Sequence, residues 1–179
     1  MKKVLLVLVS AVGLTAASYA QKGTTQIGVA AEVGLPMSDF GDAAKTGFGA
    51  SVRGLFGIGT AGQISFTTGY TTYSMKDAPD GMSAHFNVIP LLAGYRHNFS
   101  GFFVEPQVGY GIYGAKVKQD GESFSDSNGG FTWAVGAGYA KNGFEGGVRY
   151  QSASVEGSTM SLVGIHIGYN FSLGGSSSK

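Results

Sequence analysis

Residues 163–171 read Val-Gly-Ile-His-Ile-Gly-Tyr-Asn-Phe. Apolar side chains recur there at every second position, which is the periodicity of a β-strand. One face carries Val163, Ile165, Ile167, Tyr169 and Phe171, and the other carries Gly164, His166, Gly168 and Asn170. The stretch therefore predicts a strand with one apolar wall and one wall of small or polar residues.

Seven earlier segments show the same alternation: residues 25–34, 47–57, 63–73, 86–97, 102–112, 131–140 and 144–151. With residues 161–171 they make eight strands, each close to the roughly 9–11 residues that a tilted strand needs to cross a bilayer. Three connectors are short (58–62, 98–101 and 141–143) and four are longer and polar (35–46, 74–85, 113–130 and 152–160). An even number of strands, with short turns at one end and long loops at the other, indicates an outer-membrane barrel.

The distribution of charge orients these strands. Their apolar faces contain no Lys, Arg, Asp or Glu, whereas the opposite faces carry Glu32, Arg53, Arg96, Glu105, Glu145 and Arg149. An Arg or Lys on the lipid face costs about 2–4 kcal/mol near the bilayer midplane, so we expect the charged faces to line the lumen. The inverted alternative is a soluble, ligand-carrying barrel, whose many outer glycines would pack against nothing.

The six charged residues form a predicted structural network. An eight-stranded barrel has an interior just wide enough for side chains to fill, so we expect three glutamates and three arginines to plug the lumen. Gln63, Gln107 and His166 lie on the same faces and are expected to assist. The sequence leaves the individual pairings open.

The first twenty residues have the layout of a cleavable secretory signal peptide. A basic Met-Lys-Lys start is followed by an apolar stretch over residues 4–17 and by Ser-Tyr-Ala at residues 18–20. The apolar stretch is shorter than the roughly 20 residues that span a bilayer as a helix. We predict three regions: a signal peptide (1–20), a barrel domain (21–171) and a flexible polar tail (172–179).

Composition excludes several classes of protein. Charged residues make up 13% of the 179 residues, against about 25% in ordinary soluble domains, and 31 residues are Gly. The absence of Cys excludes disulfide scaffolds, thiolate metal sites and cysteine catalysis. A formal net charge of +1 gives no electrostatic reason to expect nucleic-acid binding.

No pattern of catalytic or metal-binding residues stands out. His85, His97 and His166 fall at different levels of the predicted strands, and no Ser lies two residues from His166, as a lipid-deacylating barrel would need. Asp120, Glu122, Asp126 and Asn128 carry oxygens that calcium prefers, but their spacing is not that of an EF-hand. We expect no enzyme activity, no cofactor and no metal site, and interpret this acidic segment as a solvated loop.

Four stretches resemble a known family: residues 34–40 (Gly-Leu-Pro-Met-Ser-Asp-Phe), 89–96 (Ile-Pro-Leu-Leu-Ala-Gly-Tyr-Arg), 104–111 (Val-Glu-Pro-Gln-Val-Gly-Tyr-Gly) and 163–171. The family is that of small porin-like outer-membrane β-barrel domains of Gram-negative bacteria, akin to OmpX-type and OmpA-type barrels. The resemblance implies the barrel and its location in the outer membrane. Barrels of this family often end on an aromatic residue read by the assembly machinery, whereas here the polar tail follows Phe171.

The sequence thus predicts an all-β protein, an eight-stranded antiparallel up-and-down transmembrane β-barrel that is monomeric. We expect a structural and surface-interaction scaffold that contacts outer-membrane lipids and lipopolysaccharide and displays its long loops to an extracellular partner. The alternatives are a narrow porin-like channel for small solutes, an enzyme acting on lipid at the outer leaflet, and the soluble carrier barrel.

Overall fold

The computed structural model describes residues 24–76, 82–119, 122–155 and 157–173. The strands are β1 (Thr25–Met37), β2 (Gly47–Gly57), β3 (Gly62–Ser74), β4 (Met82–Phe99), β5 (Phe102–Gln119), β6 (Glu122–Lys141), β7 (Phe144–Val155) and β8 (Ser158–Leu173), with one short helix, α2 (Ser38–Ala43). The predicted signal peptide lies outside the described residues, and so does the tail after Leu173.

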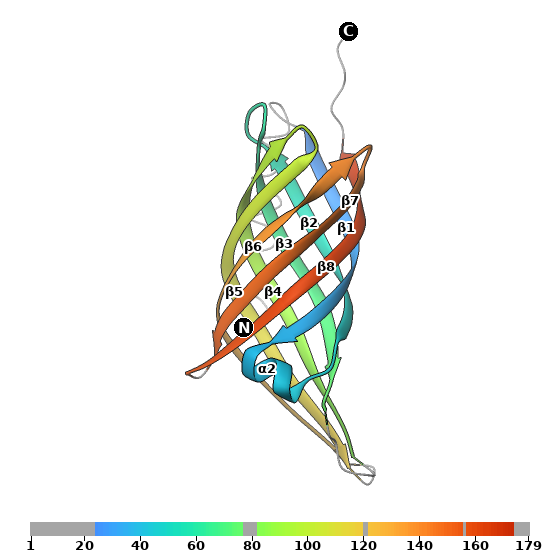
Figure 1. Ribbon diagram of the computed structural model, residues 1–179, viewed down its shortest axis with the longest axis vertical. Coiled ribbons are helices and arrows are strands. Elements are labelled where there is room, and N and C mark those ends of the chain that lie inside the picture. Colours follow the sequence, from blue (N-terminus) through green and yellow to red (C-terminus); the bar gives the residue numbers. More distant parts are fainter. Residues whose placement is uncertain (1–23, 77–81, 120–121, 156, 174–179) are drawn as a thin grey trace, which may run out of the picture.

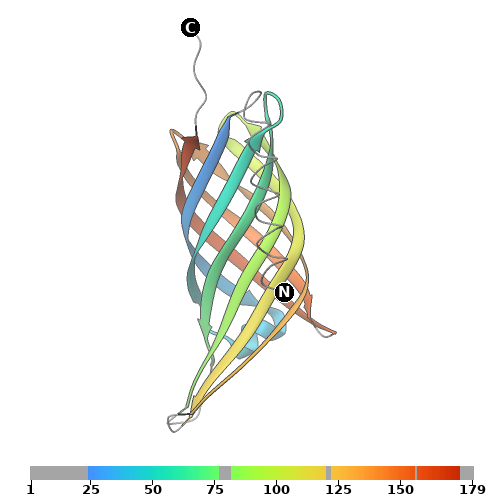
Figure 2. The ribbon, with the colours of Figure 1, turned by 180° about the vertical axis from the view of Figure 1, so that it is seen from behind.

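The eight strands form one closed antiparallel barrel in sequence order. Figures 1 and 2 show the closed wall from two sides, with the strands tilted steeply around the axis. Closure comes from β1 and β8, which pair along the whole of β1, from Thr25 opposite Leu173 to Met37 opposite Ser161. The predicted up-and-down barrel is therefore confirmed.

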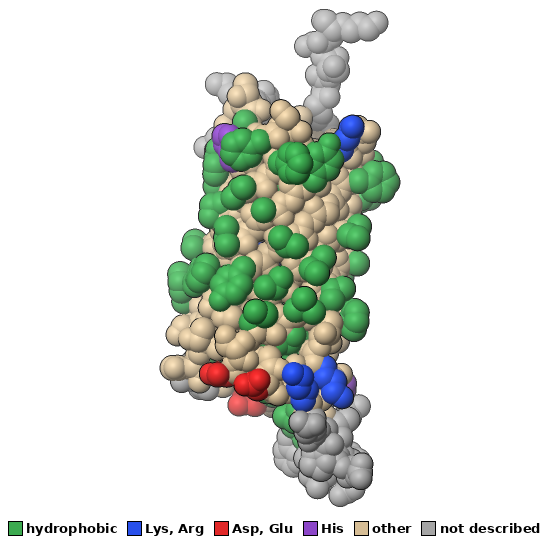
Figure 3. Space-filling model, in the orientation of Figure 1, with side chains coloured by type: hydrophobic (Ala, Val, Ile, Leu, Met, Phe, Trp, Pro, Cys, Tyr) green, Lys and Arg blue, Asp and Glu red, His purple; other side chains and the backbone are tan. Residues whose placement is uncertain are grey.

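Side chains sort by face as the alternation predicts. The outer wall exposes large apolar side chains, for example Phe144 at 68% and Ile167 at 72% of their surface. These side chains form a broad green belt in Figure 3, and the coloured charges of that view lie near the two ends. All six charged residues of the predicted network are buried inside, with exposed fractions of 7% or less.

Two of the predicted long loops, 113–130 and 152–160, are mostly strand, and a third, 74–85, is strand at both of its ends. β4 begins at Met82, β5 continues to Gln119 and β6 begins at Glu122, so this part of the sheet extends well beyond the barrel wall, at the lower end of Figure 1. Likewise, β7 ends at Val155 and β8 begins at Ser158. The boundaries of β5 and β6 were wrong because the two strands continue as a ladder of mostly polar residues, which lacks the apolar alternation that marks a half-buried strand.

The fourth predicted loop, residues 35–46, folds across one end of the barrel through α2. Phe40 is buried, and its ring makes edge-to-face contacts with Tyr73 at 5.2 Å and with Phe86 at 5.8 Å between ring centroids. The Lys76 ammonium donates a hydrogen bond to the Gly41 carbonyl. Among the described residues, no helix is long and apolar enough to cross a membrane. A segment expected to be a displayed loop is therefore partly a cap.

Candidate functional site in the barrel lumen

Glycines leave room for the charged side chains inside the barrel. Residues directly opposite each other on neighbouring strands share a face of the sheet, and five of the six charged residues have a glycine in that position. The pairs are Glu32 with Gly49, Arg53 with Gly28, Glu105 and Arg149 with Gly136, and Glu145 with Gly168. The high glycine content therefore supplies the space that long polar side chains need in a narrow lumen.

Four of the six residues form what we call the lumen cluster: Arg53, Arg96, Glu105 and Glu145. The Arg96 guanidinium donates to Glu105 Oε2 from Nε at 3.0 Å and from Nη2 at 2.7 Å. It also donates to Glu145, from Nη1 at 2.6 Å and from Nη2 at 3.1 Å. Arg53 Nη1 donates to Glu145, and its Nε lies 4.0 Å from Glu105 Oε1. The two positive and two negative charges balance inside the lumen cluster.

Neutral side chains complete the bonding of Glu105. Gln107 Nε2 lies 2.9 Å from Glu105 Oε1 and 2.9 Å from Thr67 Oγ1, and it donates to both oxygens. Gln63, which we expected to join the network, instead accepts a hydrogen bond from Asn98 Nδ2 at 3.0 Å near the short turns. Gln107 therefore donates to the lumen cluster, whereas Gln63 lies directly opposite Arg96 on the neighbouring strand but, among the described residues, makes no hydrogen bond to the cluster.

Glu145 is bonded by two further side chains from β8. His166 Nε2 lies 3.1 Å from Glu145 Oε1, and Asn170 Nδ2 donates to Glu145 Oε2 at 2.8 Å. Sequence reasoning placed His166 near the network but overlooked Asn170, although both lie on the inward face of the same strand. It also overlooked Phe103, whose ring centroid lies 3.8 Å from the Arg96 guanidinium carbon.

Arg149 and Glu32 stand apart from the lumen cluster as a pair. Arg149 Nη2 lies 3.2 Å from each carboxylate oxygen of Glu32. The other two nitrogens of Arg149, Nε and Nη1, are buried without a hydrogen-bond partner among the described residues. The expected single network of six is thus divided into a cluster of four and a pair, each of them electrically neutral.

Between the charged groups and α2 the lumen becomes apolar. A buried cluster fills this section: Phe40, Ala44, Tyr73, Val88, Tyr113, Ala153, Val155 and Leu162. Gln151 Nε2 donates to the Tyr113 hydroxyl at 3.1 Å, which joins the polar and apolar sections. Along the axis, ion pairs are followed by a layer of neutral polar groups and then by an apolar plug beneath the helix.

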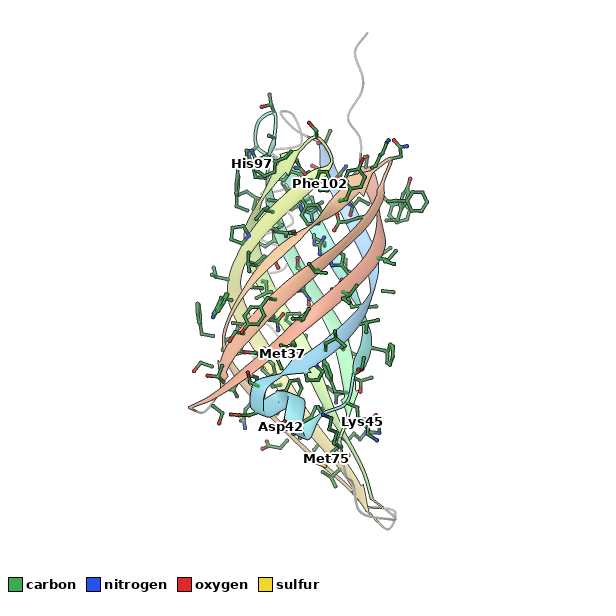
Figure 4. All side chains as sticks on the ribbon, viewed as in Figure 1. Met37, Asp42, Lys45, Met75, His97 and Phe102 are labelled. Atoms are coloured by element: carbon green, nitrogen blue, oxygen red, sulfur yellow. The ribbon has the colours of Figure 1, made fainter. Side chains whose placement is uncertain are left out.

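The end with the short turns contains a water-accessible vestibule. A cavity of about 330 Å³ is lined there by turn residues and reaches inward to Arg96 and Asn170. In Figure 4, His97 and Phe102 mark this end, and Asp42 and Lys45 mark the opposite end beside α2. The vestibule therefore ends at the lumen cluster.

The three histidines lie in three different environments. His166 bonds to Glu145 in the lumen, His97 Nδ1 lies 3.0 Å from the Tyr95 hydroxyl on the outer wall, and His85 is exposed near the loops. In the described residues, no three His, Asp or Glu side chains gather closely enough to hold a metal ion. Among the described residues, the arrangement in the lumen pairs each buried arginine with a carboxylate.

Comparison with known proteins agrees with this architecture. The model of the outer membrane protein beta-barrel domain family matches residues 4–171. A search of curated protein sequences finds no match.

Solved structures of similar fold include two complete barrels and one domain. Ail of Yersinia pestis, in complex with the heparin analogue sucrose octasulfate, has a TM-score of 0.66 at 16% identity, covering 83% of this chain and 99% of Ail. Neisserial surface protein A has a TM-score of 0.59 at 18% identity, covering 83% and 97% of the two chains. The N-terminal barrel domain of Pseudomonas aeruginosa OprF has a TM-score of 0.59 at 12% identity, covering 84% and 100%.

The apolar outer belt, the charged lumen and the match of the family model over nearly the whole chain lead to the same conclusion. This chain belongs to the outer membrane protein beta-barrel domain family, and it is an integral β-barrel of the Gram-negative outer membrane.

Proposed function

We propose that the protein is a scaffold with a closed lumen, which anchors in the outer membrane and presents its α2 end to the cell exterior. One observation supports the proposal: the ion pairs of the lumen cluster and, nearer α2, the apolar cluster around Phe40 are buried inside the barrel. Breaking a buried ion pair by removing one partner typically costs about 3–5 kcal/mol. An open pathway would need the arginines of the lumen cluster to leave their carboxylates, and this cost opposes such a movement.

Single-channel recording in planar bilayers tests the closed lumen. The wild-type barrel is expected to give no steady openings at ordinary ionic strength. The double variant Arg96→Ser/Glu145→Ser removes one charge of each sign from the lumen cluster and is expected to conduct. Val108→Ala, on the outer wall, is the matched control and should remain silent. Steady openings in the wild type would overturn the proposal.

A narrow channel for small solutes is the second candidate, because the vestibule extends inward as far as Arg96. In that case the lumen cluster would be the gate, and conductance would appear in the wild type without mutation. An enzyme acting on lipid is the least supported possibility, since the hydrogen bonds of the described residues include no Ser-His pair. Comparing lipid A from cells with and without the protein by mass spectrometry tests that possibility, and we expect no difference.

The outer rim beside α2 suggests contact with lipopolysaccharide. Lys45 N–H donates to the Ser74 carbonyl at 2.8 Å, Ser74 pairs with His85, and His85 pairs with Lys116. We call Lys45, His85 and Lys116 the rim row; all three side chains are exposed at this end of the barrel. Basic residues at a membrane surface attract anionic headgroups by about 1 kcal/mol each. The rim row therefore fits the phosphates of an outer leaflet.

Thermal unfolding in two kinds of bilayer tests this contact. The wild type should gain stability in bilayers that contain lipopolysaccharide, relative to zwitterionic phospholipid alone. Lys45→Gln/Lys116→Gln should lose that gain, and Lys141→Gln, at the other end, should keep it. Equal gains in all three proteins would refute the contact.

An extracellular partner is expected at the same end. Ail, which shares the fold, was crystallised with a heparin analogue. In this chain, the extended sheet of β4, β5 and β6 projects well beyond the barrel at the α2 end (Figure 1). We propose that this sheet, held by a rigid wall, is the surface that a partner contacts, and that the barrel acts there as a monomer.

A further inference from the structure

The α2 end holds a second cavity, which we call the mouth pocket. Its volume is about 260 Å³, and its walls come from α2 and from β4, β5, β6, β7 and β8. The apolar side chains that line it are Phe40, Phe86, Val88, Tyr113, Val155 and Met160. An apolar hollow that opens to water carries an energetic cost unless something occupies it.

Small residues in the middle strand create the hollow. Phe86, Ala115 and Asp126 lie opposite one another across β4, β5 and β6, so they share a face of the sheet. Ala115 and its neighbour Gly114 stand between the two larger side chains. A gap is therefore left between the Phe86 ring and the Asp126 carboxylate.

The walls of the mouth pocket are aromatic and its floor is closed. The rings of Phe40 and Phe86 are nearly perpendicular, at 81° and 5.8 Å between centroids. Tyr113 is buried, and its hydroxyl is bonded to Gln151 on the side of the lumen. Val88 and Val155 are buried members of the apolar plug, so the pocket is blind and does not lead into the lumen cluster.

The charge of the lining side chains determines which ligands the mouth pocket favours. Among the described residues that line it, Asp126 is the one charged side chain, and no Lys, Arg or His takes part. Aromatic faces attract cations by about 0.5–2 kcal/mol, and a carboxylate at the rim adds attraction of the same sign. Anionic ligands are disfavoured by the same groups.

We propose that the mouth pocket binds a small organic ammonium ion with an apolar body. The cationic group would lie between Asp126 and the aromatic rings, and the apolar body would cover Val88, Val155 and Met160. The pocket is smaller than the roughly 300–1,000 Å³ typical of drug-sized ligands, so the ligand is small. This binding goes beyond the scaffold role. It rests on the proposed orientation in one respect: the orientation determines from which side of the membrane the ligand reaches the pocket.

Binding of benzyltrimethylammonium to the barrel in lipid nanodiscs, measured by calorimetry with empty nanodiscs subtracted, tests the proposal. Its uncharged isostere neopentylbenzene is the comparison ligand and should bind at least fivefold more weakly. Asp126→Asn should weaken binding of the cation about threefold, the effect expected of one exposed ion pair. Asp42→Asn removes an exposed carboxylate from the same end, outside the pocket, and should leave the affinity unchanged.

Variants that fill the mouth pocket with a larger side chain provide a second, independent test of the proposal. Met160→Trp should reduce binding more than tenfold, and Ala115→Leu fills the same space if the first variant does not fold, as judged by heat-dependent gel mobility. Three results would overturn the proposal: equal binding of the uncharged isostere, equal effects of Asp126→Asn and Asp42→Asn, or full binding by a folded, filled variant. None of these outcomes depends on whether the lumen is closed or conducts. The proposed scaffold role can therefore be refuted without refuting ligand binding in the mouth pocket, and the reverse also holds.

Discussion

Arg96 is the most deeply buried charged side chain in the described part of the barrel, with 1% of its surface exposed. Its guanidinium joins Glu105 and Glu145, so Arg96→Ala leaves two carboxylates in the lumen with Arg53 alone to compensate them. We expect the free energy of unfolding to fall by about 3–5 kcal/mol, as measured by urea titration in lipid vesicles. Val108→Ala on the outer wall is the control, with an expected loss below about 1 kcal/mol. An unchanged midpoint for Arg96→Ala would show that the lumen cluster does not stabilise the fold.

Two glycines offer a matched test of space inside the barrel. A methyl group at Gly138 would lie 2.6 Å from the Phe103 ring and 2.5 Å from the Gly146 carbonyl oxygen, whereas at Gly164 the nearest atom is 3.7 Å away. Gly138→Ala is therefore expected to cost about 1–3 kcal/mol through overpacking. Gly164→Ala should be neutral in the same urea titration. Equal costs would mean that interior packing does not explain these glycines.

The sequence predicts which residues enter the lumen, but not which of them meet. Alternation along a strand assigns a side chain to a face, and this rule places all six charged residues correctly inside. The partners are far apart in sequence, although the pairing of β1 with β8 brings their strands near each other: Arg53 and Glu145 are 92 positions apart, and Arg149 and Glu32 are 117 positions apart. Strand tilt and register determine such meetings, and neither property is encoded in local periodicity.

The helix α2 has one buried side chain, that of Phe40. It has six residues and no side-chain hydrogen bond at its N-cap, so it cannot be stable alone. Phe40 attaches it to Tyr73 and Phe86. Phe40→Ala should therefore release residues 38–43 without unfolding the barrel. We expect faster amide hydrogen exchange over these residues and unchanged exchange in β1 and β8, measured by mass spectrometry. Equal protection in both proteins would contradict the anchor role.

The first and last residues of the strands show where prediction of secondary-structure elements from the sequence fails. β2 was predicted with both limits correct, because its apolar alternation runs along its whole length. β5 and β6 were predicted too short, because beyond Gly114 and Ser127 the two strands continue as a paired ladder of mostly polar residues. The sequence does contain one indication that residues 38–43 cap the barrel. Phe40 is an apolar residue inside an otherwise polar connector.

The whole molecule combines an apolar exterior with a charge-neutral interior, and closure makes both possible. In lipid, an unpaired backbone N–H or C=O costs several kcal/mol, and the continuous pairing of β1 with β8 removes the last free edge within the wall. Among the described residues, the ion pairs inside balance in sign, so they leave no net charge in the narrow bore. The same wall then holds two unlike ends: a polar vestibule at the short turns and an apolar pocket under aromatic rings near α2.

The orientation of these two ends can be tested in intact cells, because the chain contains no Cys. Asp42→Cys places one thiol on α2, and Thr60→Cys places one in the short turn between β2 and β3. Both native side chains are exposed, so neither substitution disturbs the interior. A membrane-impermeant maleimide should label the thiol at position 42 in intact cells, and the thiol at position 60 only after the outer membrane is permeabilised. The opposite pattern would place the mouth pocket and the rim row on the periplasmic side, and would remove the basis for contact with lipopolysaccharide and with ligands from outside.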